Sequence, residues 1–369
     1  MLKNNDLIYI NISILENMID MKLFDDKERT EIRPSTGNEN SFDYFNNTGR
    51  SDVIPIRDIM ENWYRIYPDS EKCEMKKRLM ADFGPSFYEL GIHSYFKNMG
   101  YNIAIHPIVP NTSKRPDFLA TKNTDEFYVE IKEMRMSSDA DRLKERRLNT
   151  LTDSMNLIDS TNFMLCIENI HFKTGKQPSG KNIIRYFNNI FKSIDPGVYR
   201  EKLEKDGFRF MPMLKYEDED VCIEVKLWPK ASHLRGKNGR AIASYGSYTK
   251  IGGDEEMIKN ALQSKANRYG DLDKPFLICL NYPSTFLHEE DIKLALYGTE
   301  SFFGTASKPK NTRVSAVLIT DFTVSGLLKA NLYYHKNPFA KKEIPFLPSS
   351  DLVRCLELTD GYIAEFGSI

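Results

Sequence analysis

The sequence lacks any uninterrupted apolar run approaching the about 20 residues that a membrane-spanning helix needs, which excludes that class of membrane protein. It also opens without the features of a secretory signal. Residues 1–22 interleave Asn, Asp and Glu with apolar positions and show neither a basic start nor a small-residue cleavage site. A soluble, cytoplasmic chain with no membrane partner is therefore expected.

Cysteine is scarce and scattered, which argues against a structural zinc site and against a disulfide scaffold. None of the five cysteines forms a close pair with another. Cys166, Cys222 and Cys279 fall inside apolar, strand-like runs, where a free thiol behaves as a small hydrophobic side chain. A reducing compartment and a role in filling the core fit these residues.

An excess of charge of one sign is also missing, because 51 basic residues face 52 acidic ones and leave a formal net charge of -1. Binding to nucleic acid would therefore require a local basic surface. Neither GxxxxGK[ST] nor GxGxxG is present, which disfavours an ATP-driven role within this chain.

The length allows one elaborated domain or two ordinary ones. Residues 1–52 are polar and expected to be partly flexible, with the run at 33–52 interpreted as a linker. Residues 53–81 have helical spacing and predict a helical lead-in. One domain is expected over 82–346, and residues 347–369 are expected to form a tail that packs on it.

Within the expected domain, a helix starting at Ser86 and ending at Gly100 leads into a strand meander. Helices and strands then alternate to the end of the domain, which predicts an α/β fold with a mixed sheet flanked by helices. The expected helices after the meander lie at 139–155, 181–194, 254–269 and 289–298. The expected strands lie at 163–172, 275–282, 313–322 and 328–338, with a hairpin at 208–228.

The segment EFYVEIKEMR carries the pattern of greatest chemical interest. Side chains alternate along a strand, so Glu130 and Lys132 share the face opposite Phe127, Val129 and Ile131. The preceding segment RPDF can pair with this strand through the turn KNTD and bring Asp117 close. Carboxylates hold Mg²⁺, which can activate water, and a lysine can orient that water or stabilise charge on a phosphodiester.

A helix with Glu89, then Asp117 after a proline, then Glu130-Ile131-Lys132, resembles the PD-(D/E)xK, restriction-endonuclease-like superfamily. The resemblance extends over about Phe83 to Phe346, and within this fold the sequence is similar to a bacterial branch. It rests on the segments FYELGIHSYFKNMGYNIAIHP, RPDF, ALQSKANRYGDLDKPFLICLN, ALYG, VSAVL and NP.

The resemblance implies a restriction-endonuclease-like core that hydrolyses DNA with Mg²⁺, for which Mn²⁺ can substitute. Asp117, Glu130 and Glu89 would be the metal ligands, and Lys132 would serve the water or the transition state, so that all four are catalytic candidates. Defence against foreign DNA or repair is the role such a family suggests. A protein partner for targeting and a homodimer are both compatible with it.

Each of these residues also has a plain structural interpretation. Ser86 and Glu89 fit a capping box at a helix start. Glu130 and Lys132 could form the polar face of an ordinary strand, paired with charges such as Asp117. A second ExK, Glu224 to Lys226, follows the acidic turn at 217–220, but no Pro-Asp strand and helix precede it.

Lys265 falls on an otherwise apolar helix face with Ile258, Leu262 and Tyr269. A buried ammonium needs a partner, so a carboxylate or a phosphate is expected beside it, unless the side chain snorkels to solvent. In the resemblance a polar residue of this helix joins the site, which makes Lys265 and Gln263 candidates for substrate binding.

Other basic residues could follow a phosphate backbone, although a solvated surface explains any single one of them. These candidates are Lys114, Arg115 and, in the loop at 233–240, Arg235. His93 and His106 lack metal-ligand spacing and are expected at the surface or at caps.

The main rival to an enzyme is a non-catalytic module that binds nucleic acid or protein with a nuclease-like fold. A free acidic pair with its lysine would favour catalysis, whereas a Glu130 engaged in salt bridges would favour the module. Target recognition could also reside in a partner chain, because no DNA-reading motif such as a zinc finger is present.

Overall fold

The computed structural model describes residues 21–110, 112–134, 139–245, 254–282, 289–324 and 330–345. The chain divides into two compact units. The core unit comprises Met1–Arg33, Asn40–Arg135 and Gly252–Ile369, and the inserted unit comprises Pro34–Glu39 and Met136–Ile251. Each unit has a sheet of its own, and each is described by itself.

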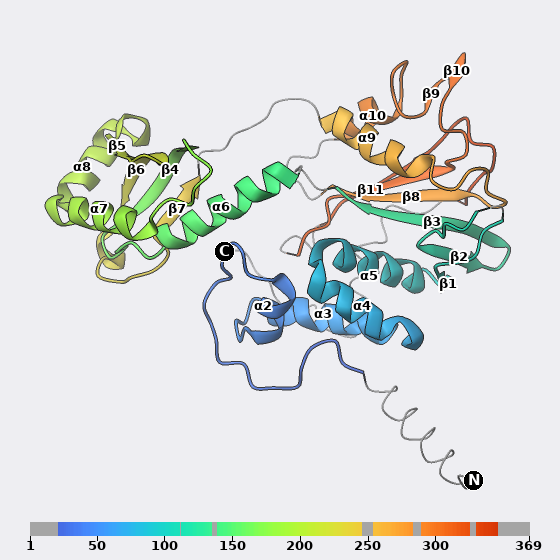
Figure 1. The fold of residues 1–369 in the computed structure, drawn as a ribbon, viewed down its shortest axis with the longest axis horizontal. Helices are drawn as coiled ribbons and strands as arrows, with labels where there is room; N and C mark the ends of the chain where they lie inside the picture. Colours follow the sequence, from blue (N-terminus) through green and yellow to red (C-terminus); the bar gives the residue numbers. More distant parts are fainter. Residues whose placement is uncertain are drawn as a thin grey trace, which may run out of the picture. The chain divides into compact units, whose positions relative to one another are not determined.

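The core unit is built on a six-stranded mixed sheet of order β1-β2-β3-β8-β11-β12 (Figure 1). Neighbours β3 and β8, and β8 and β11, run parallel, and the other neighbouring pairs run antiparallel. The strands are β1 (Asn102–Ile105), β2 (Phe118–Lys122), β3 (Asp125–Glu133), β8 (Phe276–Asn281), β11 (Ala316–Thr320) and β12 (Leu332–Lys336). Every residue of β8 and β11 is buried, as expected for central strands covered on both faces.

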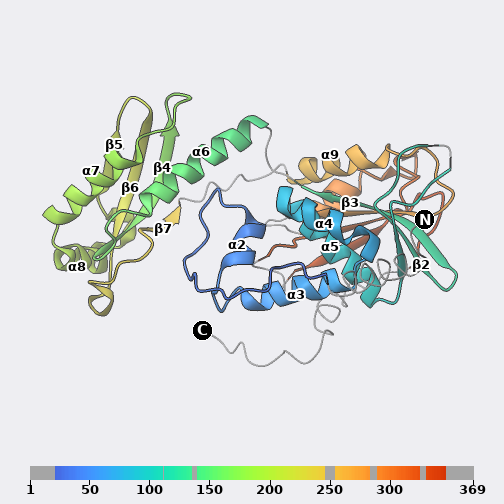
Figure 2. The ribbon, with the colours of Figure 1, turned by 60° about the horizontal axis from the view of Figure 1, so that its bottom comes forward.

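Helices cover both faces of this sheet (Figures 1 and 2). One face packs on α5 (Phe83–Asn98), supported by α2 (Ser41–Asn47), α3 (Ile54–Arg65) and α4 (Asp69–Ala81). The other packs on α9 (Asp254–Ala266) and α10 (Glu289–Leu296), and a short hairpin of β9 (Gly304–Thr305) and β10 (Lys308–Pro309) follows. Val129 and Ile131 belong to the first core and Tyr128 to the second, which confirms the expected alternation of β3.

The inserted unit has its own four-stranded sheet, of order β5-β6-β4-β7, and its own hydrophobic core. Helices α6 and α7 contribute Leu151, Met155, Ile183 and Phe187 to that core. Its helices are α6 (Asp139–Met155), α7 (Gly180–Ser193), α8 (Pro196–Asp206) and the short 3-10 turns η1 (Phe208–Phe210) and η2 (Ser232–Leu234). Its strands are β4 (Phe163–Phe172), β5 (Met213–Glu217), β6 (Val221–Pro229) and β7 (Ile242–Tyr245).

The expected mixed α/β class is confirmed, but the single domain expected over 82–346 is divided by the inserted unit. The alternation of helices and strands continues through the insertion, so the sequence pattern gives no sign of the division. The expected helical lead-in is present as α3 and α4, although its Trp63 and Leu79 lie inside the core unit's hydrophobic core.

The linker interpretation of residues 33–52 is wrong around α2. Asn40 caps this helix by accepting a hydrogen bond from the Asp43 amide at 3.2 Å, and Phe42 and Phe45 are buried. The burial of these two aromatic side chains, three positions apart, stabilises α2 although the segment around them is polar. The tail expected at 347–369 lies outside the described residues.

In the part of the chain that the structure describes, no helix is both long enough and apolar enough to cross a membrane.

Gly91 allows the closest approach between α5 and its aromatic neighbours. A Cβ added there would lie 2.7 Å from Cζ of Phe322 and 3.3 Å from Cζ3 of Trp63. The crowding costs about 1–3 kcal/mol, against a helix-propensity gain of about 1 kcal/mol. We therefore expect Gly91→Ala to lower the free energy of unfolding of the core unit by about 1 kcal/mol.

Denaturation in urea followed by tryptophan fluorescence measures this effect. A Trp228→Phe background leaves Trp63 as the single reporter, because the chain has two tryptophans. Gly84→Ala is the matched control in the same helix, since its new Cβ meets only the flexible carboxylate end of Glu133. Equal stability of the two variants would contradict the packing interpretation.

Candidate functional site

The β2–β3 hairpin brings Asp117 to the strand that carries Glu130. Phe118 pairs with Val129, so Asp117, one residue earlier, lies beside Glu130 and Ile131. Its Oδ2 accepts a hydrogen bond of 2.6 Å from the Ile131 amide, and its carbonyl oxygen accepts one of 2.9 Å from the His106 amide. A side-chain bond to β3 and a backbone bond to His106, which follows β1, thus fix the position of this carboxylate.

Glu130 is fully buried and holds several partners from α9 and the turn after it. Its Oε1 lies 2.5 Å from Nζ of Lys265 and 2.9 Å from Nη1 of Arg268. The Tyr269 hydroxyl donates to Oε2 and also lies 3.0 Å from the carbonyl oxygen of Arg115. Two cations and a phenol together compensate the loss of water around a buried carboxylate.

Lys132 follows on the same strand face, where it is half-buried. In the parallel pairing with β8, Glu130 stands opposite Ile278 and Lys132 opposite Leu280, and both of these β8 residues belong to the core beneath α9. The expected placement of Glu130 and Lys132 on one face is therefore confirmed.

The surroundings of Asp117 disfavour its charged form. Burial and the neighbouring carboxylates Glu130 and Glu89 raise the pKa of Asp117 to about 7, although the Ile131 amide and Lys265 act in the opposite direction. Burial and the adjacent Glu130 also raise the pKa of Tyr269 far above its ordinary value, which keeps its hydroxyl a hydrogen-bond donor. The site therefore concentrates negative charge in a place poor in water.

Glu89 projects from α5, and its capping-box interpretation is wrong because the helix begins at Phe83 and Ser86 lies inside it. Instead, the buried Glu89 carboxylate receives two hydrogen bonds from Arg78, at 2.5 and 2.8 Å, and one from the Tyr67 hydroxyl at 3.1 Å. Its influence on Asp117 places it in the same acidic neighbourhood. Its assignment as a metal ligand stays a prediction.

The expectation that Lys265 has a buried partner is confirmed, and the partner is the Glu130 carboxylate. Gln263 turns elsewhere and exchanges two side-chain hydrogen bonds with Asn311, at 3.1 and 3.0 Å. Lys114 and Arg115 are exposed near Asp117 in the sequence. The structure therefore joins Lys265 to the site and leaves Gln263 in a different contact.

Arg235 belongs to the inserted unit, where its guanidinium donates to the carbonyl oxygens of Lys230, at 3.2 Å, and Pro196, at 3.0 Å. This side chain thus holds a loop together. Arg268 is the partner of Glu130 that sequence reasoning missed. It lies three residues after Lys265 in the helix expected over 254–269, but this spacing alone does not distinguish an inward arginine from an exposed one.

The competing ExK pair is engaged in ordinary contacts of the inserted unit. Glu224 accepts a hydrogen bond of 3.3 Å from Asn169, and Lys226 donates one of 2.9 Å to the carbonyl oxygen of Arg209. In the acidic turn, Asp218 accepts from the amides of Asp220 and Val221, both at 2.9 Å. This turn is structural, as its plain interpretation predicts.

His93 is buried rather than at the surface or at a cap, so that expectation is wrong. Its ring lies between those of Tyr67 and Phe118, with centroid distances of 4.6 and 5.8 Å. Burial lowers the pKa of His93 to about 3, which leaves the ring neutral. The aromatic contacts explain why a histidine is tolerated in this core.

The carboxylates of Asp117 and Glu130 are the oxygen donors that a divalent cation would use at β3. Among the described residues no group of three or more His, Cys, Asp or Glu side chains is arranged to hold a metal. Mg²⁺, however, commonly uses only one or two carboxylates and completes its shell with water and substrate phosphate. Asp117 and Glu130 fit that pattern as hard oxygen donors whose mutual repulsion a cation relieves.

The raised pKa of Asp117 predicts a pH-dependent stability. In the unfolded chain Asp117 loses its proton above its ordinary pKa of 3.8, whereas in the folded protein it keeps the proton up to about pH 7. The stability that this group contributes is therefore present below pH 3.8 and is lost as the pH rises towards 7. Asp117→Asn removes the titration. We expect the free energy of unfolding of Asp117→Asn, relative to wild type, to increase between pH 4.5 and 7.5, by an amount on the order of a few kcal/mol.

Urea denaturation in EDTA at several pH values, with Trp63 as reporter, measures this difference. Asp271→Asn is the matched control, because the Asp271 side chain is 75% exposed and its removal alters no buried charge. If the free energies of unfolding of wild type and Asp117→Asn changed in parallel with pH, the pKa of Asp117 would not be raised in the folded protein.

No family model matches this sequence, and no match is found among curated proteins or solved structures. The resemblance to the PD-(D/E)xK superfamily therefore rests on the residues alone. What the structure adds is that Asp117, directly before β2, lies beside Glu130 on β3, that Lys132 shares the strand face of Glu130, and that Glu89 on α5 helps to raise the pKa of Asp117.

Proposed function

We propose that the core unit is a metal-dependent nuclease that hydrolyses DNA phosphodiester bonds at Asp117, Glu130 and Lys132. The observation that carries this proposal is that Asp117 lies beside the fully buried Glu130, and that burial and this neighbouring carboxylate raise the pKa of Asp117 to about 7. Two carboxylates whose repulsion is not fully relieved favour the binding of a divalent cation.

When bound, Mg²⁺ or Mn²⁺ would supply a polarised water and neutralise charge on the phosphate. Asp117 and Glu130 would hold the ion through carboxylate oxygens, and Glu89 would support its outer side. Lys132, two residues after Glu130, would orient the water or stabilise negative charge on the phosphodiester. The exposed Lys114 and Arg115 would bind the flanking backbone of the substrate.

Lys265 and Arg268 have a definite part in this scheme. They neutralise Glu130 while no cation is bound, so a metal ion must take over at least part of the charge compensation that they provide. Lys265 would then be available to contact a substrate phosphate. The cation must also displace the proton of Asp117, so its affinity is expected to rise with pH through about 7.

A second candidate is a non-catalytic module that binds nucleic acid or protein, and the contacts of Glu130 favour it. Both carboxylate oxygens already have partners, in Lys265 and Arg268 on one side and Tyr269 on the other. A structural ion pair of this kind needs no metal. The two candidates differ in one measurable property, which is whether a divalent cation binds at Asp117 and supports cleavage.

The biological setting belongs to the same proposal. Defence against foreign DNA or repair suits a DNA nuclease in the cytoplasm, with a partner protein or a second copy of the chain assisting the choice of target. A fold of this type hosts several functions, so these roles follow from the nuclease proposal and from no separate residue.

The deciding experiment incubates the wild type and Lys132→Ala with plasmid and with single-stranded DNA in Mg²⁺, Mn²⁺ or EDTA. We expect cleavage by the wild type that EDTA abolishes and that Lys132→Ala reduces by about a hundredfold or more. Lys226→Ala is the matched control, because it removes the lysine of the other ExK pair and is expected to cut as the wild type does.

A thermal shift in Mg²⁺ separates metal binding from cleavage. The ion is expected to raise the Tm of the wild type and to leave that of Asp117→Asn unchanged. No cleavage in any condition and no shift in Tm would reject the nuclease and favour the module. A shift without cleavage would place the metal site correctly and indicate a missing partner.

A further inference from the structure

The inserted unit contains a hollow of about 560 Å³ along one side of α6. Leu143, Arg146, Arg147 and Thr150 follow the spacing that places side chains on one face of a helix. Phe172 at the end of β4 and Thr174 just after it line the hollow as well. Lys144 also lines the hollow, and no acidic residue does.

Arg147 lines this hollow and is held in place by contacts with Phe172, Thr174 and Lys176. Its guanidinium carbon lies 4.3 Å from the centre of the Phe172 ring, and its Nη2 donates to the carbonyl oxygens of Thr174, at 2.9 Å, and Lys176. Its Nε is buried and makes no hydrogen bond in the described structure. A cation is thus fixed against an aromatic face, with one donor unused.

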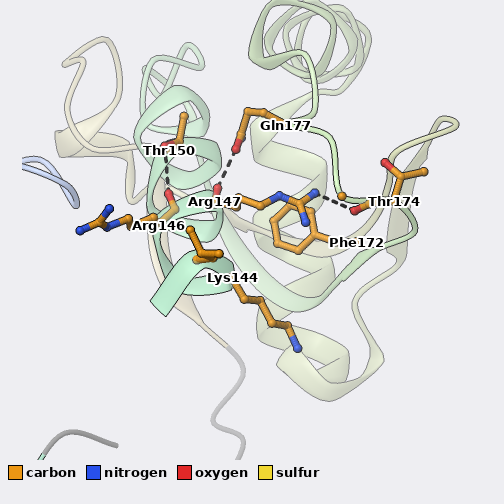
Figure 3. Close-up of a pocket in the computed structure, with 9 residues that line it drawn as sticks. Lys144, Arg146, Arg147, Thr150, Phe172, Thr174 and Gln177 are labelled. Atoms are coloured by element: carbon orange, nitrogen blue, oxygen red, sulfur yellow. Dashed lines mark hydrogen bonds between the residues drawn. The ribbon is translucent and has the colours of Figure 1, made fainter. Parts of the chain in front are cut away.

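Lys144 and Arg146 are exposed on either side of Arg147. Neither side chain forms an ion pair within the described part of the chain. Figure 3 shows the three basic side chains spreading in different directions from one turn of α6. Cations that spread along a rim match the successive phosphates of a strand, whereas a single phosphate group would require them to converge.

The charge of the segment agrees with an anionic ligand. Residues 136–251 contain 20 Lys and Arg against 15 Asp and Glu, although the whole chain has a net charge of -1. The positive charge that binding to nucleic acid requires is therefore concentrated in the inserted unit.

From these observations we propose that the α6 hollow is a nucleic-acid binding site that holds the phosphodiester backbone of a DNA strand. Lys144 and Arg146 contact successive phosphates, and Arg147, backed by Phe172, positions the backbone between them. This site is distinct from the acidic site of the core unit. It does not depend on the core unit being a nuclease, and it would supply the target binding that a nuclease core needs.

The test measures the affinity of the full-length chain for single-stranded and duplex oligonucleotides in EDTA, at 50 to 200 mM salt. Cleavage plays no part in this readout, so a core unit that does not cut leaves the outcome interpretable. We expect the wild type to bind, and the double variant Lys144→Ala/Arg146→Ala to bind more weakly. Its slope of log affinity against log salt is expected to fall by about 1 for each lost phosphate contact.

Lys202→Ala/Lys205→Ala is the matched control, because it removes the same charge from exposed positions of α8, outside the hollow. It is expected to keep the slope of the wild type. An equal loss in both double variants would show a general charge effect and overturn the site. The site would also be overturned if the wild type did not bind, or if Lys144→Ala/Arg146→Ala left the slope unchanged.

A competition with ATP and inorganic pyrophosphate identifies the source of the phosphate. Oligonucleotide binding that these small anions displace only at high concentration supports a site for a strand. Tight binding of ATP that Lys144→Ala/Arg146→Ala abolishes, with no oligonucleotide binding, would reject the proposal in favour of a mononucleotide pocket.

Discussion

The arrangement of the core unit depends on the burial of the Glu130 carboxylate. A carboxylate with no exposed surface is tolerated only where charge and hydrogen bonds replace water, and α9 and the turn after it supply Lys265, Arg268 and Tyr269 for this purpose. This requirement fixes the rotation of α9 about its own axis, because Lys265 must point inward between Leu262 and Tyr269. The helix that covers the sheet therefore also completes the acidic site.

The buried Glu130 carboxylate also helps to raise the pKa of Asp117. The cations Lys265, from α9, and Arg268, from the turn after it, lie on the Oε1 side of Glu130. Asp117 retains a raised pKa although Lys265 lowers it. Glu89 adds further negative charge from the opposite helix, α5, while Arg78 and Tyr67 hold its own carboxylate. Acidic side chains from β3, from the residue before β2 and from α5 thus act on one another, and among the described residues Glu130 and Glu89 are the two that pair with cations.

Local pattern predicted much of this site, because its central features are properties of single segments. Alternation along β3 places Glu130 and Lys132 on one face, the short turn after Asp117 sets the hairpin register, and helical spacing turns Lys265 inward. The pairing of Arg78 with Glu89 and of Arg268 with Glu130 could not be predicted in this way. Both depend on how separate helices pack on the sheet, and exposed and inward arginines look alike in a sequence.

The inserted unit shows the same limit at the scale of domains. The segments α6, β4 and α7 were predicted closely, yet nothing in their hydrophobic pattern says that β4 pairs with β6 and β7 rather than joining β8. Strand pairing is decided by which faces find a complementary surface, and Leu165, Val225 and Phe187 find theirs within the insertion. This separation has a functional consequence under both proposals. A chain with a net charge of -1 can place acidic side chains for a metal in one unit and basic side chains for a phosphate backbone in the other. Each unit then carries the charge that its own ligand requires.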